Sequence, residues 1–147
     1  MAKSGTYETD ILGLLLNATP ISGIADNAAT SPATDLYVAL HTADPGTAGT
    51  QTTNEVAYTG YARVAVSRSN TAAAWTISGT GPATANPNAT IAFPSATGGT
   101  ATATYFSIGS ASTGAGTIYY SGAISPTISI SSGVTPELTT STAISES

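Results

Sequence analysis

The feature that most constrains this chain is a long stretch without charge. From Ser69 to Pro136, nearly half of the 147 residues, no side chain is charged at pH 7. Segments of such Ser-, Thr- and Gly-rich composition are often disordered, because they bury too little apolar area. Here, however, large apolar residues such as Trp75 and Ile108 recur with a period of two, which is typical of a half-buried β-strand. The stretch is therefore predicted to fold as β-structure.

Charge is scarce in the whole chain, which has 3 Lys and Arg, 8 Asp and Glu, and a formal net charge of -5. Three basic residues cannot form the cluster that neutralises phosphates, so no nucleic-acid partner is expected. No apolar run reaches the length of about 18 residues that spans a bilayer, so no membrane partner is expected. Glu8 and Asp10 interrupt the N-terminal region, which argues against a secretory signal. The absence of cysteine excludes disulfides and thiolate chemistry.

The one helix that the sequence predicts lies at residues 6–17. Four apolar residues fall on one stripe at helical spacing: Tyr7, Ile11, Leu14 and Leu15. Thr6 is the expected N-cap. Because Leu12 and Leu16 are apolar as well, this helix is too apolar to face solvent on all sides. We expect it to dock on its own sheet or on a neighbouring subunit.

The clearest strand lies at residues 35–42. Its alternation places Leu36, Val38 and Leu40 on one face and Tyr37, Ala39 and His41 on the other. The Asp44-Pro45-Gly46 sequence that follows predicts a tight turn, since proline fixes φ and glycine accepts a positive φ.

A second strand is predicted at residues 61–68, with Val64 and Val66 facing inward and Arg63 facing outward. Further strands are expected at residues 55–58, 73–78, 89–93, 102–108, 117–121 and 126–131. Turns are expected at residues 79–88, 94–100 and 112–116.

Short strands at intervals of about ten residues, separated by Gly, Pro and Asn, are typical of a β-sandwich. The predicted fold class is all-β, an antiparallel β-sandwich of jelly-roll or Greek-key type with one short N-terminal helix. A β-helix is the competing architecture, but the chain has no fixed short repeat. The expected organisation is a helix and arm at residues 1–24, a sandwich domain at 35–138 and a tail at 139–147.

The sequence offers no catalytic, cofactor-binding or metal site. His41 is the only histidine, and we expect it to be a hydrogen-bonded residue at a strand end, near the Asp-Pro-Gly turn. No metal-binding loop, nucleophile elbow or phosphate-binding glycine loop is present. A glycosidase would need two facing carboxylates among the scattered acidic residues, and this is the least favoured interpretation. The protein is not expected to be an enzyme or to carry a cofactor.

A surface of Thr, Ser, Ala and Gly imposes little desolvation penalty, so it can pack closely against another copy. We therefore predict a structural protein that acts as a homo-oligomer. The expected assembly contacts are the apolar residues Leu12, Leu15 and Leu16 of the helix, together with Arg63 and Arg68.

Several segments resemble a small virion-protein family of tailed bacteriophages. The most specific is Leu-Tyr-Val-Ala-Leu-His-Thr-Ala-Asp-Pro-Gly at residues 36–46. Residues 1–4, 55–64, 91–94, 105–109 and 118–122 fit the same pattern, and the resemblance extends to about residue 138. Members of this family are often described as tail-fibre proteins, and they are also similar to the jelly-roll cement proteins that decorate phage capsids.

The resemblance implies a structural virion protein. The favoured hypothesis is a capsid cement or decoration protein on the capsid exterior, whose partners are its own copies, with a trimer as one arrangement, and the major capsid protein. The alternative is a tail-associated structural, receptor-binding or glycan-binding protein, which would need an aromatic residue exposed on a loop. In either case the protein would be made in the cytoplasm of the bacterial host.

Overall fold

The computed structural model describes residues 4–21, 33–69, 72 and 74–146, and the chain forms two compact units. Unit 1 comprises Met1–Asp35, Ser67–Thr90 and Thr139–Ser147, and unit 2 comprises Leu36–Val66 and Ile91–Leu138. The predicted divisions at 1–24, 35–138 and 139–147 follow the chain in order, whereas each unit combines segments that are distant in the sequence. The ends of the predicted helix and arm, at residues 1–3 and 22–24, lie outside the described residues.

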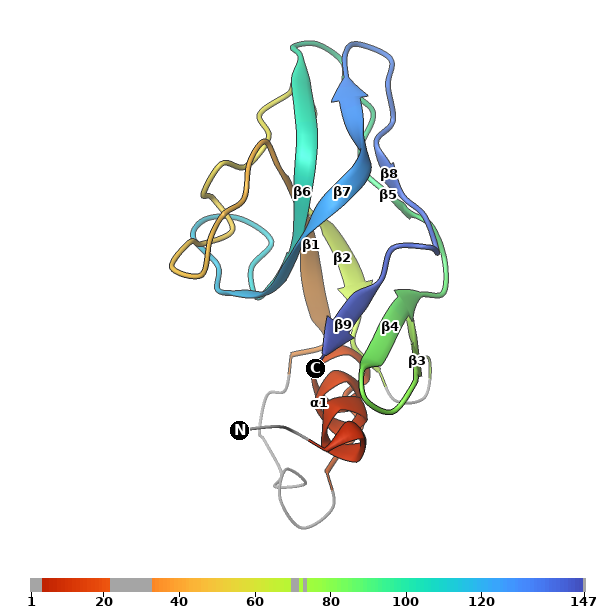
Figure 1. Ribbon diagram of the computed structural model, residues 1–147. Helices are drawn as coiled ribbons and strands as arrows, with labels where there is room; N and C mark the ends of the chain where they lie inside the picture. Colours follow the sequence, from red (N-terminus) through yellow and green to blue (C-terminus); the bar gives the residue numbers. More distant parts are fainter. Residues whose placement is uncertain (1–3, 22–32, 70–71, 73, 147) are drawn as a thin grey trace. The chain divides into compact units, whose positions relative to one another are not determined.

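Unit 1 contains one helix on a small antiparallel sheet. The helix is α1 (Gly5–Asn17), and the strands are β3 (Trp75–Ser78), β4 (Ala83–Pro87) and β9 (Ile144–Glu146), in the order β3-β4-β9. Helix α1 contacts all three strands (Figure 1). Of the two expected docking partners, its own sheet or a neighbouring subunit, the structure shows the helix on its own sheet. None of the helical segments described here has the length and apolar character needed to cross a membrane.

Both ends of α1 are capped by groups of unit 1. The N-cap is Ser4, whose hydroxyl accepts from the Tyr7 N–H at 3.3 Å, so the prediction of Thr6 as the cap is wrong by two residues. At the other end, Ala18 has a left-handed conformation, with φ 53°. The guanidinium of Arg68 donates to the carbonyls of Leu14 and Leu15, both at 2.7 Å. A cation at this end of a helix also interacts favourably with the helix dipole.

The face of α1 that packs on the sheet differs from the predicted stripe. Leu12 and Leu16 are 0% exposed, whereas Tyr7 is 44% exposed and Leu15 is half-buried. The sheet surface opposite the helix includes the small buried residues of β4, which allow close approach. Because Leu12 and Leu16 extend the apolar part of the helix well beyond the predicted stripe, spacing alone could not distinguish the buried face.

Unit 2 contains a four-stranded sheet with the order β2-β1-β6-β7 and a two-stranded sheet β5-β8 (Figure 1). The strands are β1 (Asp35–His41), β2 (Val64–Ser67), β5 (Ile91–Ala92), β6 (Ala101–Gly109), β7 (Ile118–Ile130) and β8 (Glu137–Leu138). The β1–β6, β6–β7 and β5–β8 pairs are antiparallel. The predicted class, all-β with antiparallel sheets and a single N-terminal helix, is confirmed.

Strand β1 lies between two neighbours and is buried on both faces. Leu36, Val38 and Leu40 are at most 3% exposed, and Ala39 and His41 on the other face are 0% exposed. Trp75, Phe106 and Ile108 are also buried, whereas Ile77 and the two valines predicted to face inward, Val64 and Val66, are only half-buried.

Several predicted elements differ from the structure. Residues 79–88, predicted as a turn, contain β4; the predicted tail contains β9; and the two strands predicted at 117–121 and 126–131 are one strand, β7. Residues 55–58 form no strand and contribute only an isolated bridge between His41 and Glu55. Strand β4 has the sequence Ala-Thr-Ala-Asn-Pro, in which only the threonine favours β-strands, and its alternate residues are buried in the unit. Tertiary packing therefore determines this strand.

Candidate functional site

Two loops of unit 2 lie side by side (Figure 1). We call residues 42–54, which follow β1, the β1 loop, and residues 110–117, between β6 and β7, the β6–β7 loop. Their backbones are joined by an isolated bridge between Thr50 and Thr117 and by the Gln51 N–H, which donates to the Gly116 carbonyl at 2.9 Å. The two loops thus form one continuous surface element.

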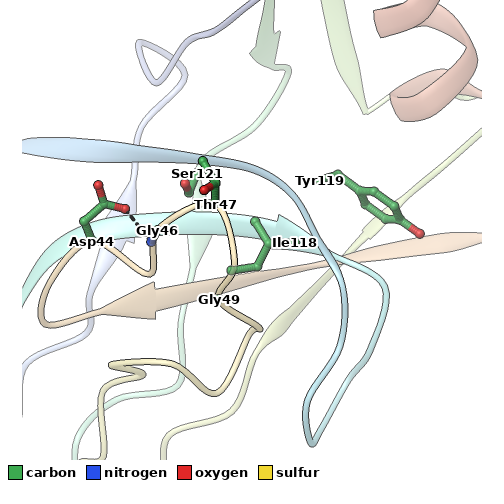
Figure 2. Close-up of a pocket in the computed structure, with 7 residues that line it drawn as sticks. All are labelled: Asp44, Gly46, Thr47, Gly49, Ile118, Tyr119 and Ser121. Carbon is green, nitrogen blue, oxygen red and sulfur yellow. Dashed lines mark hydrogen bonds between the residues drawn. The ribbon is translucent and has the colours of Figure 1, made fainter.

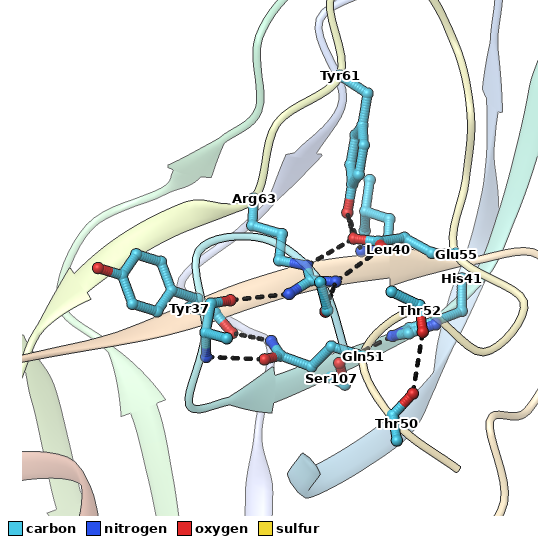
Figure 3. A network of polar contacts seen from close by, with 12 residues as sticks. Tyr37, Leu40, His41, Thr50, Gln51, Thr52, Glu55, Tyr61, Arg63 and Ser107 are labelled. Atoms are coloured by element: carbon cyan, nitrogen blue, oxygen red, sulfur yellow. Dashed lines mark hydrogen bonds and ion pairs between the residues drawn. The ribbon is translucent and has the colours of Figure 1, made fainter. Parts of the chain in front are cut away.

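Gln51 joins these loops through its side chain as well, and it is 0% exposed. Its amide nitrogen donates to the carbonyl of Tyr37 at 3.0 Å, and its amide oxygen accepts from the N–H of Ala111 at 3.0 Å (Figure 3). The space around the amide is tight, because a Cβ at Gly116 would lie 2.2 Å from the Gln51 Oε1 atom. The backbone at residue 116 can approach so closely only because it has no side chain.

A buried ion pair also holds the β6–β7 loop. The Arg63 guanidinium binds both carboxylate oxygens of Glu55, at 2.7 and 2.8 Å, and the two side chains are only 3% and 16% exposed. Arg63 also donates to the carbonyls of Ala111 and Gly114 in the β6–β7 loop, both at 2.8 Å. Such a bidentate pair is among the strongest charge-assisted arrangements in proteins. The hydrogen bonds to Glu55 raise the pKa of Arg63, which therefore stays charged.

The phenol of Tyr61 completes this group. It donates to Glu55 Oε1 at 2.9 Å and accepts from the Leu40 N–H at 3.1 Å (Figure 3). Burial raises the pKa of Tyr61 far above its ordinary value, so the hydroxyl keeps its proton. The carboxylate of Glu55 is thus held by Arg63 and Tyr61 together.

Both ring nitrogens of His41, the only histidine in the sequence, form hydrogen bonds. Its Nδ1 lies 2.8 Å from the Thr53 carbonyl and its Nε2 lies 2.8 Å from the Ser107 hydroxyl. Because a carbonyl oxygen only accepts, Nδ1 carries the proton and Nε2 accepts from Ser107. The predicted strand-end histidine with hydrogen bonds is confirmed, although its partners come from the β1 loop and β6 rather than from the Asp-Pro-Gly turn. Burial lowers the pKa of His41 below 6.5.

This lowered pKa predicts acid sensitivity. Nearby Glu55 and Asp44 raise the pKa and Arg63 lowers it, but burial is the largest influence. Between the lowered pKa and 6.5, the unfolded chain binds a proton that the folded chain does not bind. The stabilisation by neutral His41 is therefore complete above pH 6.5 and is lost as the pH falls toward the lowered pKa. We expect urea unfolding to show a lower free energy of unfolding at pH 5 than at pH 7.5.

The variant His41→Gln is the control for this dependence, because glutamine does not titrate. Its free energy of unfolding should change less than that of the wild type between pH 7.5 and 5. Equal losses in the two proteins would assign the acid sensitivity to other groups.

A hollow of about 360 Å³ lies between the β1 loop and strand β7 (Figure 2). Its walls are Asp44, Gly46, Thr47 and Gly49 of the β1 loop and Ile118, Tyr119 and Ser121 of β7. The predicted tight turn is present here: Gly46 has φ 70°, and its N–H donates to the Asp44 carboxylate at 2.8 Å. Tyr119 is 43% exposed. No group of three or more His, Cys, Asp or Glu side chains in the described parts of the chain is placed to hold a metal.

The residues predicted as assembly contacts belong to both units: Leu12, Leu15, Leu16 and Arg68 lie in unit 1, and Arg63 lies in unit 2. Leu12 and Leu16 have no exposed surface in unit 1, and of the three leucines only Leu15 keeps area that a partner could cover. Arg63 was expected to face outward, and this is wrong, because its side chain is 3% exposed. Both Arg63 and Arg68 donate to backbone carbonyls of their own unit. Any role of Leu15 or Arg68 in assembly stays a prediction.

Sequence reasoning did not identify Gln51, Glu55, Tyr61 and Ser107 as parts of one network. For two of them, the sequence contained a feature that could have marked them as candidate site residues. Gln51 is the only glutamine in the chain, and Glu55 is one of few acidic residues and lies in a segment with two tyrosines and Arg63. The partners come from distant segments, however, so their pairing depends on the fold.

The fold and this network together define an all-β protein in which buried polar side chains brace surface loops. The chain matches the protein family described as podophage GP4 fiber I protein gp80 over residues 9–144. It therefore belongs to this family and is a tail-fibre-like structural protein of a bacteriophage virion. No curated protein matches the chain.

Proposed function

We propose that the protein is a structural component of the virion fibre, located on the tail of the phage rather than on its capsid. The observation that carries this proposal is the family match, which extends over residues 9–144 and whose description names a fibre protein. The capsid cement role, with the major capsid protein as partner, is the hypothesis that the sequence analysis favoured, and it is kept here as the second candidate. The family description favours the fibre.

The geometry of unit 2 suits a structural role. The ion pair and the buried amide hold two loops in one conformation, and side chains fixed by their own packing present a surface at little entropic cost. The charge-free stretch from Ser69 to Pro136 would allow copies to pack without ionic repulsion. In this proposal the protein acts as a homo-oligomer within the fibre.

The proposed role is not catalytic. This is supported by the state of His41, which is 0% exposed and has both ring nitrogens occupied by Thr53 and Ser107. A general base must be within hydrogen-bond reach of a substrate proton. The buried ring of His41 offers no such access.

Phage particles produced without this protein test the proposal. A fibre component should be dispensable for the shell, so these particles should keep their packaged DNA on heating as well as wild-type particles do. They should also adsorb to host cells far more slowly, and protein supplied in trans during infection should restore adsorption. Particles that lose their DNA at lower temperature but adsorb normally would support the cement role and overturn the proposal.

A further inference from the structure

Strand β7 forms one edge of the four-stranded sheet, with β6 on its inner side (Figure 1). Of its 13 residues only Ile130 is buried, and the others are half-buried or exposed. In the described parts of the chain, no isolated bridge and no backbone hydrogen bond outside the sheet joins residues 121–129 to another segment. The outer side of this strand therefore presents the row of backbone N–H and C=O groups that another strand can pair with.

This edge lacks the charged side chains by which proteins usually keep a foreign strand from pairing. Strand β7 has no charged residue, and it lies within the charge-free stretch from Ser69 to Pro136. Proline also interrupts pairing because it has no N–H, and the one proline of β7 is Pro126. Residues 118–125, which precede it, form an unprotected segment about 27 Å long. We call residues 118–125 the edge segment.

The opposite edge of the same sheet is much shorter. It is formed by β2, which has only 4 residues. A very short edge strand is itself a protection against pairing. If β7 of one copy paired with β2 of the next, the contact would be limited to those few residues, whereas two edge segments can pair over their whole length. The lengths of the two edges therefore favour a symmetric contact.

The side chains of the edge segment suit a second copy of the same segment. Isoleucine and tyrosine favour β-strands, and serine hydroxyls can both donate and accept, so each can face its own kind across a pair of strands. The chain has a net charge of -5, yet this contact would bring no like charges together. The side chains concerned include Ile118, Tyr119, Ser121, Ile124 and Ser125.

We propose that two copies of this chain associate through β7, with their edge segments paired antiparallel about a two-fold axis. The two four-stranded sheets would then continue into each other. Two-fold symmetry is the commonest arrangement of homo-oligomers, and addition of a strand to a free sheet edge is a recurring mode of recognition. The inference rests on the proposed function, in which copies of the protein associate within the fibre.

The mass of the purified full-length protein tests this contact. Sedimentation velocity should show the wild type at twice the chain mass of 14.4 kDa. The dimer should persist at high salt, because the contact contains no charge for salt to screen. Ala123→Lys places a lysine from each copy in the paired segments and should raise the dissociation constant about tenfold or more. Ala123 is exposed, so this variant should keep the circular dichroism spectrum of the wild type.

Thr102→Lys is the matched control, because Thr102 is exposed and lies on β6, which is not an edge strand. It adds the same charge and should sediment as the wild type does. A monomeric wild type, an oligomer other than a dimer, an undiminished dimer in Ala123→Lys, or equal dissociation of the two lysine variants would each overturn the proposed contact.

Single introduced cysteines test the pairing itself, since the chain has no cysteine of its own. Ser121→Cys, Ala123→Cys and Ser125→Cys are oxidised separately and compared on a denaturing gel. The position nearest the two-fold axis should give the most disulfide-linked dimer, and Thr102→Cys should give almost none. Equal linkage at all four positions would contradict the proposed pairing. These measurements use the purified protein alone, whereas the fibre assignment is tested on phage particles, so either can fail without the other.

Discussion

Glu55→Gln should lower the free energy of unfolding of this protein by about 3 kcal/mol or more, because it leaves the buried charge of Arg63 without compensation. Glutamine has nearly the same shape as glutamate and can still accept one hydrogen bond, so the loss comes mainly from the charge. The guanidinium of Arg63 is 3% exposed and cannot turn to water. Urea unfolding followed by circular dichroism measures the change.

Glu137→Gln provides the matched control, since Glu137 lies in β8 and is exposed. It should change the free energy of unfolding by no more than about 0.5 kcal/mol. The double variant Glu55→Gln/Arg63→Met removes both charges and should regain part of the loss. If Glu55→Gln and Glu137→Gln had the same small effect, the ion pair would contribute nothing to the fold.

Gln51→Leu should be the second most damaging single change among the network residues. Leucine nearly fills the same space, but it leaves the Tyr37 carbonyl and the Ala111 N–H without their partner. A buried polar group left unpaired costs about 1–3 kcal/mol, and two groups are affected here. Hydrogen exchange should also become faster at the Ala111 N–H, which is the amide that Gln51 holds.

Thr52→Leu changes the exposed neighbour of Gln51 and serves as the control. It should leave both the free energy of unfolding and exchange at Ala111 nearly unchanged. Slow exchange at Ala111 in Gln51→Leu would contradict the view that this side chain joins the two loops.

The parts of the fold that could be predicted are those with strong local patterns. Strand β1 and the following Asp-Pro-Gly turn are both present where the sequence places them, although the strand is buried on both faces. Strand β6 is similarly clear. Strand β4 and strand β9 have few large apolar residues, so they form because partner strands and α1 are available. Local sequence could not indicate them.

The candidate site was less predictable than the fold, because its contacts join residues that are distant in the sequence. Arg63 alternates with inward-facing valines, and this pattern indicates an exposed side chain. In the structure its partners are Glu55 and two carbonyls of the β6–β7 loop, about 50 residues further along the chain. Only the fold places these groups within 3 Å of one another. The exposure of Tyr119 likewise depends on where the β6–β7 loop ends and β7 begins.

The location of the protein in the particle tests the central claim most directly. Virions in which this chain carries a C-terminal epitope can be labelled with antibody-bound gold and imaged by electron microscopy. The fibre assignment predicts gold on the tail fibres and a shell free of label. Gold spread over the capsid surface, with unlabelled tails, would contradict it.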